Sequence, residues 1–169
     1  ELALTNHNNV VGPNGQRQAM FLENVPGFAE RVLRNFGLDQ KDSALIISSS
    51  GCNIVPVEMA ELFQQRGIRV VAIVTKAHLE ASSSKRTDGK KLSDFADLVI
   101  DTGAPAGDSM IKIDGLETPV SPGSTAGGVM IINSIKAELA KMLTDAGQPP
   151  KVLTAACVLG AEKAAALFE

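Results

Sequence analysis

Short apolar runs alternate with amphipathic segments through the middle of the chain. The runs at 43–47, 69–74 and 98–101 are rich in Val, Ile and Leu and are bounded by polar residues, which is typical of buried strands. Apolar residues at spacings of three and four predict helices over 55–66 and 127–145. Strands that alternate with helices in this way predict right-handed crossovers and a parallel sheet.

The flanking segments predict further elements. Helical spacing continues from about Gln16 to Phe36, and Pro26-Gly27 is expected to break or kink that helix. A short helix is expected around 90–95, a short strand around 110–115, and an alanine-rich helix from about Ala161. Three parallel strands make a thin sheet for an α/β domain, so we expect strands to be missing in front of this segment.

Composition supports a single α/β domain over residues 1–169. The chain is 44% hydrophobic and 21% charged, and its aromatic residues are six Phe, so aliphatic side chains must fill the core. A net charge of −3 leaves no broad basic face, and we expect no nucleic-acid partner. Two cysteines and the lack of a signal-like or membrane-spanning segment indicate a cytoplasmic protein without membrane association.

A hydroxyl-rich turn, Ser48-Ser49-Ser50-Gly51-Cys52-Asn53, joins the strand at 43–47 to the next helix. Serine hydroxyls and backbone N–H groups can converge on an anion there, and the helix dipole favours negative charge at the same point. The plain alternative is that these residues only cap the helix. Their place at the carboxyl end of a parallel strand favours a phosphate site. It is not a nucleotide P-loop, because no Gly-Lys-Ser/Thr follows.

Two further polar segments are candidates for the same site. Ser121-Pro122-Gly123-Ser124-Thr125 precedes the helix at 127–145 and is by itself a capping sequence. Two hydroxyl-rich helix N-termini in one domain favour a shared ligand, with one end on phosphate and the other on sugar hydroxyls. The segment 82–86, Ser-Ser-Ser-Lys-Arg, is either a solvated loop or a mobile lid. Cys52 is expected to be a packing residue beside the site.

The candidate acid–base residues are Glu23, Glu58 and His78. An aldose–ketose isomerase moves a proton between adjacent carbons, and it needs a base such as Glu and a group such as His to open the ring or shuttle protons. Alternatively, Glu58 is a first-turn carboxylate that favours the helix dipole, and Glu23 is an exposed helix residue. No Cys/His spacing resembles a metal site, and we expect neither a metal nor a cofactor.

Taken together, these motifs resemble the sugar isomerase (SIS) domain family. The turn at 48–53 is similar to the Ser-Asn-Ser-Gly-x-Asn phosphosugar loop of that family. The similarity runs from about Phe21 to Pro150 and is strongest to uncharacterised bacterial SIS-domain phosphosugar-binding proteins. Other similar stretches follow in order at 89–92, 96–101, 107–108 and 121–125.

The resemblance implies a three-layer α/β/α sandwich with a parallel flavodoxin-like sheet, here without its N-terminal strands. It implies a phosphorylated sugar as ligand, and either a homo-oligomer or pairing with the missing N-terminal segment. The family includes aldose–ketose isomerases and non-catalytic sugar sensors, so both functions stay open. The residues that it assigns to the ligand are Ser48, Ser50, Gly51 and Asn53 on phosphate or sugar, and Ser121, Ser124 and Thr125 along the same pocket.

Overall fold

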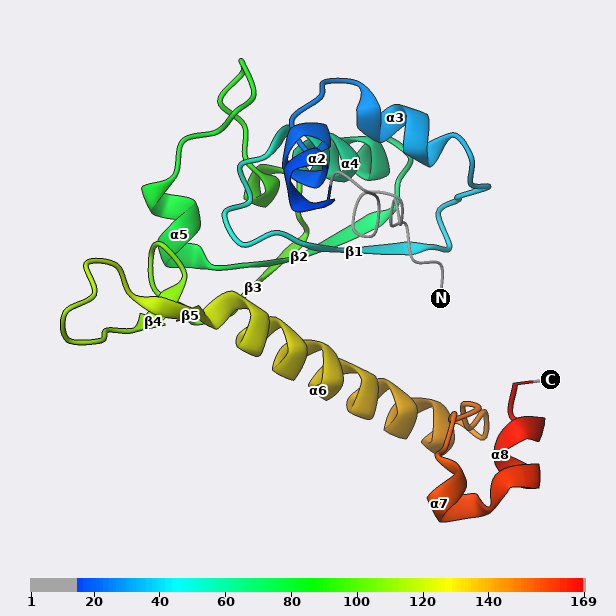
Figure 1. The fold of residues 1–169 in the computed structure, drawn as a ribbon. Coiled ribbons are helices and arrows are strands. Elements are labelled where there is room, and N and C mark those ends of the chain that lie inside the picture. The colour runs from blue at the N-terminus through cyan, green and yellow to red at the C-terminus, as the bar shows by residue number, and fades with distance from the viewer. Residues whose placement is uncertain (1–14, 169) are drawn as a thin grey trace. The chain divides into compact units, whose positions relative to one another are not determined.

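The computed structural model describes residues 15–168 and divides the chain into two compact units, Glu1–Gly128 and Val129–Glu169 (Figure 1). The first unit contains helices α2 (Gly15–Leu22), α3 (Phe28–Leu33), α4 (Ile54–Gln65), α5 (Lys76–Ala81) and the 3-10 helix η1 (Leu92–Asp94), and strands β1 (Ser43–Ile47), β2 (Arg69–Val74), β3 (Leu98–Asp101), β4 (Ser109–Ile111) and β5 (Val120–Pro122). Helix α6 (Gly123–Asp145) begins in the first unit and continues into the second, which also holds α7 (Ala156–Leu159) and α8 (Ala161–Ala166).

Strands β1, β2 and β3 form one parallel sheet in that order, and their register places Ala44 beside Val70 and Ala72 beside Val99. The predicted bounds of all three strands agree with the structure. The α/β class and the parallel sheet of a SIS-type α/β/α fold are therefore confirmed. A second, two-stranded sheet pairs β4 with β5 in antiparallel orientation. The sequence did not predict β5, because three residues around a proline carry no strand periodicity.

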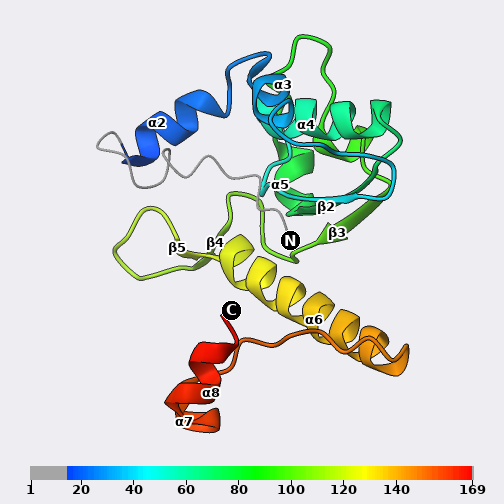
Figure 2. The ribbon, with the colours of Figure 1, turned by 90° about the vertical axis from the view of Figure 1, so that its right-hand side faces the viewer.

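The core of the first unit lies between the sheet and helices α3 and α4, which Figures 1 and 2 show along one face of the sheet. Because strand side chains alternate between faces, every second residue of β1 and β2 points into this core. The other face carries exposed apolar side chains, including those of Leu45 and Ile47. The buried core residues are Leu33, Ala44, Val57, Ala60, Phe63, Ile68, Val70, Ala72, Val74 and Leu92.

The predicted break near Pro26 separates α2 from α3. Gly27 has a φ of 76°, which a glycine adopts without steric cost. Its backbone N–H donates to both carboxylate oxygens of Glu58, at 3.0 Å each. Glu58 lies on α4, so this bond ties the turn between α2 and α3 to the helix that begins at the serine turn.

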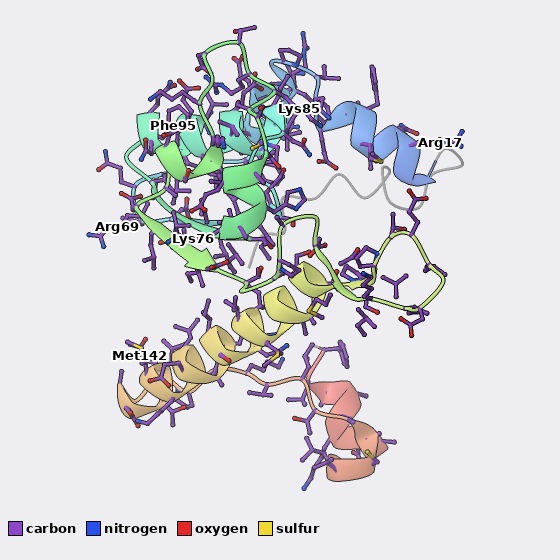
Figure 3. All side chains as sticks on the ribbon, turned by 90° about the vertical axis from the view of Figure 1, so that its left-hand side faces the viewer. Arg17, Arg69, Lys76, Lys85, Phe95 and Met142 are labelled. Atoms are coloured by element: carbon purple, nitrogen blue, oxygen red, sulfur yellow. The ribbon has the colours of Figure 1, made fainter. Side chains whose placement is uncertain are left out.

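The loop between α5 and η1 is attached to neighbouring parts of the fold through Arg86 and Lys85. Arg86 pairs with Glu61 of α4 at 2.7 Å and with Asp88 at 2.6 Å, and its guanidinium lies 5.5 Å from the centre of the Phe95 ring, labelled in Figure 3. These bonds raise the pKa of Arg86 and lower the pKa of Asp88. The backbone N–H of Lys85 also donates to the Cys52 carbonyl at 3.0 Å. These bonds attach the loop to α4 and to the serine turn.

Asp101 ends β3 and caps α5, a helix that the sequence did not predict because its six residues are too few to show periodicity. One Asp101 oxygen accepts the backbone N–H groups of Lys76 and Gly103, each at 3.0 Å. These two bonds favour the charged carboxylate and hold the pKa of Asp101 below its ordinary value. Asp101 therefore stabilises the start of α5 most strongly when it is ionised.

This cap predicts a stability difference that depends on pH. A depressed pKa in the folded state stabilises the fold above the unfolded carboxyl pKa of about 3.9, and the gain is lost as the pH falls through the lower folded value. We expect Asp101→Asn to lower the urea midpoint at pH 7 and to differ less from the wild type at pH 3. Asp114→Asn, in an exposed turn, is the control and should show no such convergence. An Asp101→Asn deficit of equal size at both pH values would contradict this role.

Candidate functional site

The turn that follows β1 is shaped by two serines and one glycine. Ser48 Oγ accepts the backbone N–H of Gly51 at 3.2 Å, and Ser50 Oγ accepts that of Cys52 at 3.3 Å. Gly51 has a φ of +60°, and a Cβ added there would lie 2.9 Å from a methyl of Leu79 and 3.3 Å from Cβ of Leu92. The two hydroxyls brace the turn, and only glycine fits at its centre without strain.

The same turn leaves backbone donors free. Within residues 15–168, the N–H groups of Ser49 and Ser50 have no hydrogen-bond partner. Asn53 is the N-cap of the twelve-residue helix α4, and its side chain makes no capping bond. Unpaired N–H groups beside the positive end of a helix attract anions. The turn at 48–53 therefore has the donors that a phosphate site needs.

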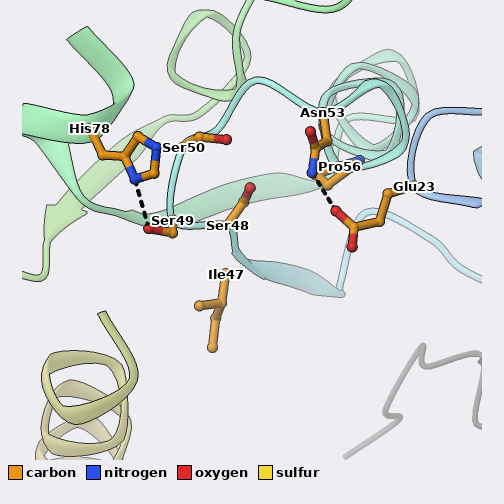
Figure 4. A pocket seen from close by; sticks show the side chains of 8 residues that line it. All are labelled: Glu23, Ile47, Ser48, Ser49, Ser50, Asn53, Pro56 and His78. Carbon is orange, nitrogen blue, oxygen red and sulfur yellow. Dashed lines mark hydrogen bonds between the residues drawn. The ribbon is translucent and has the colours of Figure 1, made fainter. Parts of the chain in front are cut away.

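A pocket of about 500 Å³ opens above this turn (Figure 4). The ends of α2 and β1, the turn, and helices α4 and α5 all contribute to it. In Figure 4, Glu23 and His78 lie on opposite sides of Ser48. The lining residues are Glu23, Ile47, Ser48, Ser49, Ser50, Asn53, Pro56 and His78.

Both acid–base candidates in the pocket are held by residues of the turn. The Glu23 carboxylate accepts the side-chain N–H of Asn53, and the Glu23 carbonyl accepts the backbone N–H of Val55 at 2.9 Å. The Nδ1 atom of His78 lies 3.4 Å from Ser49 Oγ. The structure thus brings together a carboxylate, an imidazole and the serine hydroxyls around one pocket.

Other candidates from the sequence lie elsewhere. Glu58 is bonded to Gly27, and it is absent from the pocket lining among the described residues. Gly51 shapes the turn without lining the pocket. Cys52 is buried, with its Sγ 3.8 Å from the Ser82 carbonyl, and burial raises the pKa of its thiol. Cys52 is thus a packing residue, as expected.

The second hydroxyl cluster, at the start of α6, is partly used within the fold. The two carboxylate oxygens of Asp108 accept the backbone N–H and the hydroxyl of Ser124, at 2.6 and 2.7 Å. Asp108 and Ser121 both have positive φ values, of 72° and 70°. Within the described residues, the pocket lining contains none of Ser121, Ser124 and Thr125. Their contact with a ligand stays a prediction.

The sequence reasoning missed Thr75, which follows β2 and is completely buried. Its Oγ1 lies 2.7 Å from Thr102 Oγ1 and 3.5 Å from Ser49 Oγ. The available signal was a hydroxyl residue directly after an otherwise apolar strand, at the same sheet edge as the serine turn.

An open parallel sheet with a hydroxyl-rich pocket at the carboxyl end of β1 is the arrangement in which α/β domains commonly bind small ligands. The comparison with known families agrees, because residues 1–75 match the model of the SIS domain. This part of the chain is thus similar to the SIS domain, and the family resemblance of the sequence is confirmed.

The chain is also similar to several bacterial UPF0309 proteins. It is 33% identical to one from Brucella anthropi over 142 residues, 84% of this chain and 57% of that protein. It is 34% identical over 137 residues to one from Listeria innocua, covering 80% of this chain and 56% of that protein. A third, from Halalkalibacterium halodurans, is 33% identical over 145 residues, 86% of this chain and 60% of that protein. The chain thus spans less than two thirds of the length of these relatives.

Two general properties complete the description of the site's surroundings. Among the residues that the structure describes, no helix is both long and apolar enough to span a membrane. In the same part of the chain, no group of three or more His, Cys, Asp or Glu side chains is arranged to hold a metal ion.

Proposed function

We propose that this domain binds a phosphorylated sugar, with the phosphate on the turn at 48–53 and the sugar between Glu23 and His78. The observation that carries the proposal is that the N–H groups of Ser49 and Ser50, beside the N-terminus of α4, have no partner among residues 15–168. No Lys or Arg is among the described residues of the lining. The phosphate is therefore held by N–H groups, hydroxyls and the helix dipole.

The carboxylate of Glu23 determines how the ligand is oriented. A phosphate beside Glu23 would place two negative charges close together, which is unfavourable. The phosphate therefore binds at the serine end, and the neutral hydroxyls of the sugar face the carboxylate. This arrangement places a base beside the carbon atoms of the sugar, as aldose–ketose isomerisation requires. Isomerisation of a sugar phosphate is the reaction that we propose.

A non-catalytic phosphosugar sensor is the second candidate function. The bond from Asn53 to Glu23 supports it, because a carboxylate that accepts a hydrogen bond from the turn couples the phosphate site to the end of α2. Ligand binding at the turn would then be reported through Glu23 to α2. The two functions share one pocket and differ in whether a proton leaves the sugar.

Removal of one hydroxyl from the turn tests the phosphate assignment. We expect Ser50→Ala to weaken the binding of sugar phosphates about tenfold, because a hydrogen bond to a charged group contributes about 1.5 kcal/mol. Binding of the unphosphorylated sugars should change little. Titration calorimetry against hexose, pentose, heptose and amino-sugar phosphates, with free sugars and inorganic phosphate as controls, measures both.

The matched control is Ser82→Ala, because Ser82 is outside the pocket lining in the described residues. It should bind every ligand as the wild type does. Equal losses for phosphorylated and free sugars in Ser50→Ala would contradict the phosphate assignment. If no sugar phosphate binds the wild type, the proposed function itself is wrong for this chain.

A further inference from the structure

A line of hydroxyl groups leads from His78 into the interior of the first unit. Ser49 Oγ lies 3.4 Å from His78 Nδ1, the contact drawn in Figure 4. Ser49 donates its hydroxyl proton to Thr75 Oγ1 across 3.5 Å, and Thr75 Oγ1 is 2.7 Å from Thr102 Oγ1. Thr75 is completely buried and is the one buried polar residue in the part of the chain that the structure describes.

The hydroxyl of Thr75 has no other role in the local structure. Thr75 is the N-cap of α5, yet its side chain makes no capping bond. Asp101 takes that role through the backbone N–H of Lys76. A buried hydroxyl without a partner is costly, so the bonds to Ser49 and Thr102 explain why it is tolerated.

The bond from Ser49 to Thr75 sets the direction of the bond to His78. A serine hydroxyl has a single proton, and Ser49 donates it to Thr75. The Ser49 oxygen can therefore only accept from His78, and Nδ1 must carry a proton to donate it. Thr75 Oγ1 and Thr102 Oγ1 share a further bond of 2.7 Å, in which either hydroxyl can be the donor. Thr102 Oγ1 also accepts the backbone N–H of Ala104 at 3.4 Å.

We infer that Thr75 is a positioning residue that holds neutral His78 in the Nδ1–H tautomer, so that Nε2 offers a lone pair to the pocket. Within residues 15–168, Nε2 has no hydrogen-bond partner, and His78 lines the pocket. A lone pair there accepts a hydroxyl of the ligand or takes up its proton. The choice of a sugar hydroxyl as that partner rests on the proposed function, whereas the tautomer does not.

Nitrogen NMR of the imidazole ring tests the tautomer directly. His7 is the other histidine of the sequence, so a His7→Asn background leaves one ring to observe. In spectra of the neutral ring we expect the proton on Nδ1. Thr75→Val keeps the shape of the side chain and removes the acceptor of Ser49. Ser49 then donates to Nδ1, and the proton of the ring should move to Nε2. Thr75→Ser keeps the hydroxyl and should keep the Nδ1–H form.

A second variant covers the case in which Thr75→Val does not fold, as judged by circular dichroism. Ser49→Ala removes the link at the surface of the pocket, and the preference for Nδ1–H should disappear. An Nε2–H tautomer in the wild type would overturn the inference, as would an unchanged tautomer in the folded variants. These spectra need no ligand. A failure here is therefore distinct from a failure to bind sugar phosphates.

Discussion

Glu23→Gln is expected to reduce deuterium uptake from solvent at C1 or C2 of a bound sugar phosphate by about a hundredfold to ten thousandfold, the usual contribution of a general base. Binding should stay within a few fold of the wild type. The amide has the same shape as the carboxylate and can still accept the side-chain N–H of Asn53. Only the ability to take up a proton is lost. Proton NMR of the sugar in deuterated buffer measures the exchange, and calorimetry measures the binding.

Glu80→Gln is the matched control for this experiment. It makes the same change of charge on the exposed surface of α5, outside the pocket lining of the described residues. Its exchange rate should equal that of the wild type. Exchange that persists in Glu23→Gln would assign the base to another group. A wild type that binds sugar phosphates without any exchange would favour the sensor over the isomerase.

Gly51→Ala is expected to lower the free energy of unfolding by about 2–4 kcal/mol. Two effects add. A positive φ costs a residue with a side chain about 1–2 kcal/mol. The new methyl would also lie 3.3 Å from Cβ of Leu92, which is buried and cannot turn away, and 2.9 Å from a methyl of Leu79. Urea denaturation of the wild type and the variant measures the difference.

Gly89→Ala separates these two effects. Gly89 has a φ of +73°, and nothing lies within 4 Å of a Cβ added there. It should show the backbone cost alone, about half of the loss in Gly51→Ala. Equal losses of unfolding free energy in the two variants would mean that the contacts of the added methyl with Leu79 and Leu92 do not destabilise the fold. Only Gly51→Ala should also displace the N–H groups of Ser49 and Ser50 and so abolish phosphate binding.

The central sheet was predictable because its signals are local. The runs at 43–47, 69–74 and 98–101 are apolar, short and bounded by turn residues, and these signals are sufficient to predict strands of a parallel sheet. The pairing of β4 with β5 was not predictable, because each strand has three residues and is stabilised by the other. Helix α5 begins where Asp101 caps it, and that residue is 25 positions away in sequence.

The pocket was predictable only in part, for a similar reason. Ser48 to Asn53 are contiguous, so their convergence at the end of β1 follows from one strand and one helix. Glu23 and His78 were candidates by residue type alone. Glu23 and His78 come together at the turn because the helix breaks near Pro26 and because the crossover places α5 beside the turn. The parallel register of β1 and β2 places Thr75 opposite Ser49. This register cannot be read from the sequence.

The fastened loop around Arg86 has a kinetic consequence. A lid that must open and close commonly limits turnover, because product leaves only as fast as the lid moves. The ion pair of Arg86 with Glu61 and the bond from Lys85 to Cys52 attach this loop to α4 and to the serine turn. If these bonds persist in solution, a ligand enters the pocket without a gating motion of that segment. The lifetime of the complex would then follow from the strength of the contacts in the pocket.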